Sequence, residues 1–211
     1  MTTAGDAAPD RSRPDWIVRL HRETATEPPA ASSGSALALA GNVIAHRGPG
    51  GAPYGAVTIH HRSMRGQLQQ TPDVVDLRCE SRDLPAARSA PPTTDLNHVV
   101  HIIFSRFDDP EAIERFLDAT RGLIDEYIIG REAWFEVVAD PTDAEGATLA
   151  EPIVDDVYVG RYPTLRAWEA LHEIEPWKVA IERLEAEAST MFHLVVAPTV
   201  NRLAEHRGPG S

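Results

Sequence analysis

One amphipathic helix between two strand-forming segments constrains the fold more than any other feature of this sequence. In DDPEAIERFLDATRGLIDEY, Asp109 can cap a helix and Pro110 occupies the first helical position. Apolar residues then recur at helical spacing from Ile113 to Tyr127. LNHVVHIIFSRF before this helix and REAWFEVVAD after it are rich in residues that favour strands. The apolar face of the helix is therefore expected to pack on a sheet.

The remainder of the second half completes a repeating order of elements. DVYVGRY is expected to be a strand, PTLRAWEALHEIEPWKVAIERLEAEAS a helix capped by Thr164 with a kink or restart at Pro176, and MFHLVVAPTV the last strand. The order βαββαβ predicts the α+β, ferredoxin-like class, with an antiparallel four-stranded sheet and both helices on one face. The other sheet face needs a cover, which a second subunit, a second copy in the chain or a ligand can supply.

The first half carries a weaker version of the same pattern. WIVRLHRE, ALALAGNVIAH and AVTIHHRS are expected to be strands, MRGQLQQTPDVVD a short helix interrupted near Pro72, and LRCESRD a closing strand. The first two segments align with LNHVVHIIFSRF and REAWFEVVAD, and AVTIHHRS aligns with DVYVGRYP. We therefore divide the chain into a disordered arm (1–14), a degenerate ferredoxin-like half (15–84), a linker (85–95), a ferredoxin-like domain (96–200) and a flexible tail (201–211).

Composition excludes several function classes. The formal net charge is −12 at pH 7, whereas nucleic-acid surfaces need clustered Lys and Arg, so no nucleic-acid partner is expected. A single cysteine, Cys79, cannot form an internal disulfide or a thiolate metal cluster. No run approaches 18 apolar residues and the first residues lack the apolar core of a signal peptide. These features predict a cytoplasmic protein with no membrane partner.

Two of these stretches carry a family resemblance, namely VYVGRYPTLRAWEALHEIEPWKVAIERL and DPEAIERFLDATRGLIDEY. Residues 96–200 resemble the dimeric α+β barrel superfamily, which includes antibiotic-biosynthesis monooxygenases, EthD-like proteins and stress-responsive barrel proteins. Here EPW stands in place of the SPxF/Y that is common in the family. The resemblance implies a barrel made of two sheets, either in a homodimer or in a tandem pseudo-dimer. It implies little about chemistry, because the superfamily hosts unrelated activities.

Haem breakdown is one of those activities. The resemblance implies an iron-binding histidine a few residues after the aromatic residue that corresponds to Trp177. Lys178, Val179, Ala180 and Ile181 follow it here. His172 lies earlier on the same helical segment and is interpreted as a solvent-facing residue.

Single histidines on strands are the preferred acid–base candidates, because imidazole titrates near neutral pH. His101 and His193 lie on the first and last strands of the second half, and Tyr158 lies on its third strand. We assign these three residues as candidate catalytic groups, although buried structural roles for them stay open. No metal site is expected, because neighbouring histidines such as His60 and His61 point to opposite faces of a strand. A site joining the distant His60, His101 and His193 also stays open.

The substrate-binding candidates are aromatic and basic. Trp134 on a strand, with Trp168 and Trp177 on the following helix, can wall an aromatic pocket between sheet and helices, although core or dimer contacts would explain them equally well. Arg161 is a candidate for holding a carboxylate or phenolate, and His60 completes the set. Like Arg106 and Arg131, Arg161 stands at a strand end, where arginines are usually solvated.

The leading hypothesis is a small-molecule enzyme of bacterial secondary metabolism that works without a cofactor. It would oxygenate, cyclise or rearrange an aromatic or polyketide-like substrate after a His or Tyr removes an acidic proton. GxGxxG, GxxxxGK[ST], GxSxG, HExxH and CxxC are all absent from the sequence. The alternatives are a non-catalytic barrel that binds a small molecule or stabilises an assembly, and a haem-binding barrel enzyme.

Overall fold

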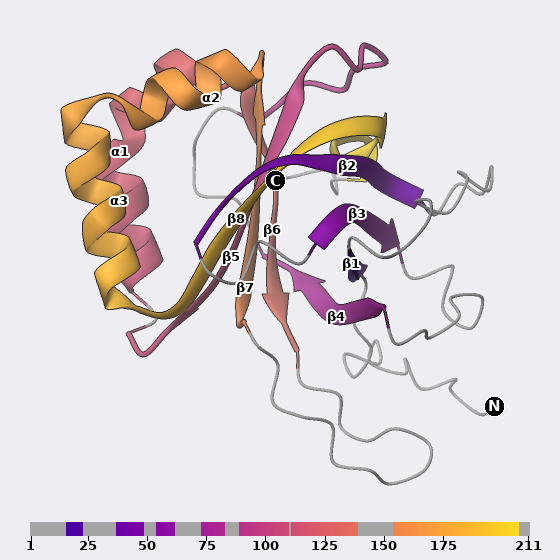
Figure 1. Ribbon diagram of the computed structural model, residues 1–211, viewed down its shortest axis with the longest axis horizontal. Helices are drawn as coiled ribbons and strands as arrows, with labels where there is room; N and C mark the ends of the chain where they lie inside the picture. Colours follow the sequence, from indigo (N-terminus) through magenta and orange to yellow (C-terminus); the bar gives the residue numbers. More distant parts are fainter. Residues whose placement is uncertain are drawn as a thin grey trace, which may run out of the picture.

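Eight strands form a closed antiparallel barrel in the computed structural model (Figure 1). The structure describes residues 16–22, 37–48, 54–61, 73–82, 89–109, 111–138 and 154–206. Around the barrel, the strands follow the order β1-β3-β2-β8-β5-β7-β6-β4. Their bounds are β1 Trp16–Arg22, β2 Leu37–Arg47, β3 Tyr54–His61, β4 Val74–Ser81, β5 Val99–Phe107, β6 Gly130–Val137, β7 Asp156–Tyr162 and β8 Ala188–Asn201.

The two halves of the chain arrange their strands in the same order. The neighbours run β2, β3, β1, β4 in the first half and β6, β7, β5, β8 in the second. β1 thus takes the place of β5, β2 that of β6 and β3 that of β7, which are the three pairs of segments aligned in the sequence. The halves join where β2 pairs with β8 and where β4 pairs with β6. The barrel therefore closes within one chain, and the first half supplies the cover that the second sheet needs.

The backbones of β2 and β8 approach each other closely where the two halves meet. Gly41 of β2 stands opposite Pro198 of β8, at an irregularity in the register. A Cβ atom at Gly41 would lie 2.4 Å from the carbonyl oxygen of Ala197, so only glycine fits between these strands. The proline is tolerated in β8 because the register shifts at this point.

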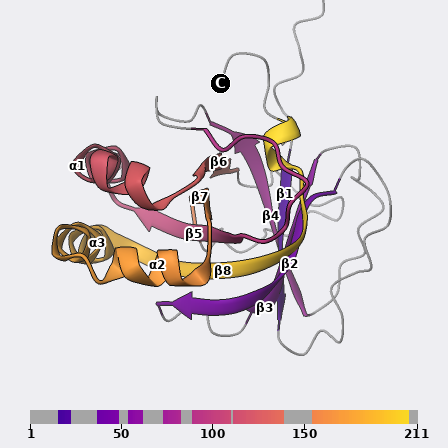
Figure 2. The same ribbon diagram turned by 90° about the horizontal axis from the view of Figure 1, so that it is seen from above.

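In the described part of the chain, three α-helices cover the outer face of the second half (Figure 2). They are α1 Ala112–Tyr127, α2 Leu165–His172 and α3 Glu175–Glu187. The expected caps are present, since Asp109 Oδ1 accepts from the backbone N–H of Glu111 and Thr164 Oγ1 accepts from that of Ala167. Pro176 lies in the first turn of α3, so the expected kink is a restart that divides the second helix in two. None of the helices in the described part of the chain is long and apolar enough to cross a membrane.

Alternation along the strands separates two apolar clusters. Val100, Ile102 and Phe104 of β5 belong to the barrel-interior cluster, in which Phe104 stacks on Phe192 with ring centroids 4.7 Å apart. Residues of the opposite parity, such as Ile103, pack beneath the helices in the helix–sheet cluster. This barrel-interior cluster forms a packed apolar core.

Some expected boundaries differ from the structure. Val74–Asp76 belong to β4 and not to a helix, because their backbones pair with β1. The remainder of that expected helix and the arm at 1–14 lie outside the described residues. The packed chain continues past Val200, since Leu203 is buried in a 3₁₀ helix at Leu203–His206. Within the expected linker, Ala90 is buried and bonded to the backbone of β6.

Candidate functional site

Two of the three candidate catalytic residues form a buried pair. His101 on β5 and His193 on β8 lie on the same sheet face, and His101 Nε2 is 2.9 Å from His193 Nδ1. Their rings stack with centroids 5.0 Å apart, and their exposed fractions are 2% and 0%. Because one ring nitrogen must donate to the other, the pair can carry a proton from one ring to the next. Such a pair is suited to acid–base chemistry.

Aromatic rings from α2 and α3 surround this pair. Trp168 and His172 of α2 lie 5.5 and 6.1 Å from the His101 ring, measured between centroids. Trp177 of α3 lies 5.6 Å from His172, and the Trp168 and His172 rings are 4.3 Å apart. Two of the predicted tryptophans therefore wall the site. We call the five residues His101, His193, Trp168, His172 and Trp177 the histidine–tryptophan cluster.

His172 corrects the expectation from the sequence. It is a buried residue at the end of α2, and its Nδ1 lies 2.8 Å from the carbonyl oxygen of Trp168. The restart at Pro176 turns the chain there, so that α2 presents its last turn to the sheet. A solvent-facing role for His172 was wrong because helical spacing alone does not show where a second helix begins.

Burial keeps the three imidazoles neutral. It lowers the pKa of His193 to about 3 and holds the pKa of His101 well below its usual range, with the neighbouring histidines adding to the effect. The pKa of His172 is also lowered by burial, although its bond to Trp168 opposes the shift. Burial raises the pKa of Tyr162, whose ring lies 5.8 Å from His101, so this phenol stays protonated. At neutral pH the site therefore holds neutral bases and neutral donors.

Several polar atoms of the histidine–tryptophan cluster lack a protein partner. They are the indole nitrogens of Trp168 and Trp177 and the Nε2 atoms of His172 and His193, which make no hydrogen bond with any residue that the structure describes. A buried polar atom left unsatisfied costs about 1–3 kcal/mol. Such atoms are rare in native proteins, and residues with a catalytic role are one place where they occur.

The first half contributes a charge to this site. Arg47 ends β2 and stands opposite His193 in the register with β8. Its guanidinium makes a two-pronged ion pair with Glu185 of α3, at 2.7 and 3.1 Å. It is close enough to lower the pKa of His101, His172 and His193 as a secondary cause after burial. Arg47 can therefore stabilise negative charge that develops beside the histidines.

Tyr158, the third candidate catalytic residue, shares this face. It stands opposite Ile103, whereas Gly160, two residues further along β7, stands opposite His101. The rings of Tyr158 and Tyr162 flank Gly160, and the Tyr162 ring lies 5.8 Å from that of His101. Tyr158 therefore lies in the same layer as the histidine pair.

Other predicted residues lie away from the site. The indole nitrogen of Trp134 donates to Asp156 Oδ1 at 2.9 Å, and the guanidinium of Arg82 lies 5.3 Å above its ring. His60 is on β3, in the other half of the barrel, where its Nε2 lies 2.9 Å from Thr58 Oγ1. Residues that sequence reasoning grouped by type are therefore separated by the fold.

Arg161 is engaged in a structural network at one end of the barrel. Two of its nitrogens donate to Glu132 Oε1, and Nη1 donates to the carbonyl oxygen of Pro91 at 2.8 Å. Asn201 donates to the other oxygen of Glu132 at 2.9 Å and lies 3.0 Å from His98 Nε2. Arg161 is only 2% exposed and Arg131 1%, so the expectation of solvated arginines was wrong. With both carboxylate oxygens occupied, this network holds the linker and the chain end against β6 and β7.

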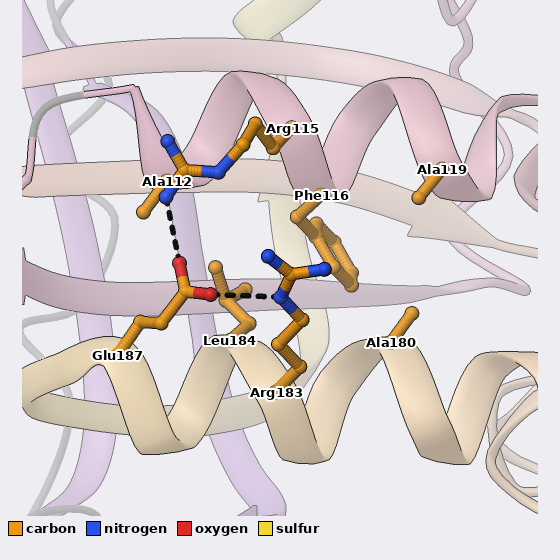
Figure 3. Close-up of a pocket in the computed structure, with 8 residues that line it drawn as sticks. All are labelled: Ala112, Arg115, Phe116, Ala119, Ala180, Arg183, Leu184 and Glu187. Carbon is orange, nitrogen blue, oxygen red and sulfur yellow. Dashed lines mark hydrogen bonds and ion pairs between the residues drawn. The ribbon is translucent and has the colours of Figure 1, made fainter.

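A shallow hollow of about 50 Å³ lies between α1 and α3 (Figure 3). Glu187 bridges Arg115 and Arg183 across its rim, at 2.8 Å to each. Phe116 forms part of its lining and makes an edge contact with Trp177, 5.3 Å between centroids. Phe116 therefore connects the lining of the hollow to Trp177 of the histidine–tryptophan cluster.

The residues present do not favour a resident metal. No group of three or more His, Cys, Asp or Glu side chains in the described ranges is arranged to hold a metal ion. The two closest imidazoles are bonded to each other through their nitrogens. The site is instead made of hydrogen-bonding rings.

Comparisons with known proteins give distant likenesses only. No protein-family model and no curated protein matches the sequence. Among solved structures, a candidate monooxygenase from Lactobacillus acidophilus is 12% identical, with a TM-score of 0.42 over 88% of this chain and 94% of that one. An anthrone oxidase-like protein is also 12% identical, with a TM-score of 0.46 over 95% and 98% of the two chains.

A major regulator of staphylococcal pathogenesis is similar at 10% identity, with a TM-score of 0.46 over 87% of this chain and 99% of that one. Likenesses this distant leave the chemistry of the chain to be argued from its own residues.

Sequence reasoning missed one residue of the site and misplaced another. Arg47 lies in the first half, and only the pairing of β2 with β8 brings it to His193. His172 was seen but placed on the wrong side of its helix. The available signal was its distance of four residues from Trp168, which puts both rings on one helical face.

Proposed function

We propose that this chain is a small-molecule enzyme that needs no cofactor and starts its reaction by moving a proton to a buried imidazole. The observation that carries the proposal is the 2.9 Å contact between two neutral, buried histidines in a layer of tryptophan rings with unsatisfied polar atoms. An imidazole kept neutral by burial accepts a proton from an acidic substrate, and its partner can take that proton onward. Indole rings pack well against aromatic groups, which supports an aromatic or polyketide-like ketone as the substrate.

The reaction then follows one of two courses, an oxygenation or a cyclisation. The imidazole takes the proton of an acidic C–H bond, and the electron pair spreads onto the neighbouring carbonyl oxygen beside Arg47. In oxygenation, the carbanion gives this pair to dioxygen, a C–O bond forms, and the peroxide takes the proton back. Loss of water from the hydroperoxide leaves a carbonyl group. In cyclisation, the carbanion attacks a second carbonyl carbon, whose oxygen then takes the proton.

The proposal includes the origin of the barrel. We infer that the two halves are copies of one ferredoxin-like unit, since they share the strand order and the pairing across both seams. The described residues of the first half contain no helix, whereas the second half has kept its helices. Duplication followed by specialisation explains why the proposed chemistry lies in the second half.

Anthrone is a suitable probe, because its methylene group is acidic and its carbanion reacts with dioxygen. Purified protein without added cofactor is mixed with anthrone, and dioxygen consumption and anthraquinone formation are followed together. Two further substrates are tested in the same way, namely 1,3-cyclohexanedione and a bis-diketone that can cyclise. His193→Gln and His101→Gln should each lower the rate by about 10²- to 10⁴-fold. His46→Gln is the matched control, because His46 is exposed on β2 and stands opposite Leu194.

The outcomes separate the proposal from its alternatives. Retention of the wild-type rate in both His193→Gln and His101→Gln would overturn the catalytic assignment. Binding of the probes with no turnover of any of them by the wild type would indicate a non-catalytic binding protein. A Soret band on addition of haemin would indicate a haem protein, although Trp177 and Ile181 are buried in the helix–sheet cluster where the resemblance would put the iron ligand.

A further inference from the structure

We infer that His172, and not the His101–His193 pair, is the group that first takes the proton from the substrate. This inference rests on the proposed function and names a further catalytic residue of the same site. It begins with the bond between His172 Nδ1 and the carbonyl oxygen of Trp168, at 2.8 Å. A carbonyl oxygen accepts and does not donate, so Nδ1 carries the hydrogen.

The tautomer of His172 is thereby fixed. A neutral imidazole has one N–H, so Nε2 of His172 carries a bare lone pair. This atom is buried and has no hydrogen-bond partner among the residues that the structure describes. By contrast, His193 Nε2 has no fixed character, since the hydrogen between His101 and His193 can belong to either ring. Only His172 presents a base that is ready before the substrate arrives.

Donors stand beside this lone pair. The indole rings of Trp168 and Trp177 lie 4.3 and 5.6 Å from the His172 ring, and each has a buried N–H without a partner in the described part of the chain. An indole nitrogen can only donate. One acceptor and two donors on adjacent rings match a group that gives up a proton and becomes an oxyanion, as an enolisable ketone or a phenol does.

The charges around His172 act on it in both directions. His101 on β5 faces it at 6.1 Å, Arg47 of β2 is paired with Glu185 of α3, and Glu173 follows it in the chain. Burial and Arg47 oppose protonation of His172, whereas its bond to the Trp168 carbonyl and the carboxylates of Glu185 and Glu173 favour it. Once His172 is protonated, the His101–His193 pair remains neutral and available to return a proton to the product.

The first test is spectroscopic and does not depend on turnover. In protein labelled with ¹⁵N-histidine, the signals of His172 are assigned by comparison with His172→Asn. At pH 7, Nδ1 should show the shift of a protonated ring nitrogen and Nε2 that of a bare one. A protonated Nε2 at this pH would overturn the inference.

The second test separates His172 from its neighbours. His172→Asn keeps an N–H near the position of Nδ1, so it can still bond the Trp168 carbonyl oxygen, but it removes Nε2. With anthrone and dioxygen, kcat should fall by about 10²- to 10⁴-fold with little change in KM, and the acid limb of the pH profile should disappear. His98→Asn is the control, since His98 is buried in the separate Glu132 network. Urea unfolding checks that both variants fold.

The failures of the two proposals are distinguishable. If His172→Asn keeps the wild-type kcat and pH profile while His193→Gln loses activity, this inference is wrong and the proposed function stands. If neither substitution changes turnover, both are wrong.

Discussion

Replacing Glu132 by Gln should destabilise the protein strongly, because it leaves a buried guanidinium without its counter-charge. Arg161 and Glu132 are 2% and 0% exposed, and both carboxylate oxygens are engaged. Removing one partner of a buried ion pair costs about 3–5 kcal/mol. In a chain of this size, that loss corresponds to a fall in Tm of about 6–20 °C.

The charge argument is tested by a double-mutant cycle. Arg161→Met in the Glu132→Gln background removes the stranded charge, although it leaves the carbonyl oxygen of Pro91 without its donor. The double variant should therefore be no less stable than Glu132→Gln alone, so its loss of stability should be smaller than the sum of the two single losses. Urea unfolding with an unchanged m value gives the free energies.

A surface pair supplies the control. Arg82 and Glu136 are 37% and 48% exposed, so Glu136→Gln should cost no more than about 1 kcal/mol. The reasoning is refuted if Glu132→Gln costs as little as Glu136→Gln, or if the losses from Glu132→Gln and Arg161→Met simply add.

Three further predictions follow from the packing and the titration of buried groups. Gly41→Ala should destabilise the protein or prevent folding, since its Cβ would lie 2.4 Å from a backbone oxygen of β8, whereas Gly160→Ala, with nothing nearer than 3.7 Å, should fold normally; urea unfolding of the two variants decides this. Burial lowers the pKa of His193 to about 3 and that of His60 to about 4. Below about pH 6.5 these histidines therefore bind a proton in the unfolded chain but stay neutral in the folded protein. The unfolding free energy should be highest above that pH and should fall toward pH 4 by up to about 1.4 kcal/mol per pH unit for each histidine. If the unfolding free energy of His193→Gln falls with pH as steeply as that of the wild type, this reasoning is wrong. Burial also raises the pKa of the Cys79 thiol to about 12, so a thiol reagent should label it at the rate of unfolding, and fast labelling of the folded protein would show that the barrel interior is accessible.

The architecture of the second half could be read from local chemistry. A capped amphipathic helix, strands with continuous apolar centres and a proline that restarts a helix are properties of short segments, and all of them are present in the structure. Whether His101, Tyr158 and His193 share a sheet face could not be read from the sequence, because alternation relates residues within one strand and the register between strands is set by the fold. The elements of the first half were harder to predict, since residues 74–76 suit the end of a helix as well as the start of a strand.

The composition of the site could not be read in this way. Arg161 and Glu132 meet because β6 and β7 are neighbours with an irregular register, and Arg47 reaches His193 across the seam between the halves. The burial of His172 depends on the angle at which α2 meets the sheet. Each of these contacts joins residues far apart in the chain, and their energies exist only after the strands have paired.

The sequence by itself determined the elements of the second half and their order, because hydrophobic periodicity and capping act within a few residues. Tertiary structure alone decided that the barrel closes within one chain, that Arg161 is bonded to Glu132, and that His172 is buried with its Nδ1 on the carbonyl oxygen of Trp168. The physical reason is that burial and hydrogen-bond partners set the protonation of an imidazole, and both are properties of the packed fold.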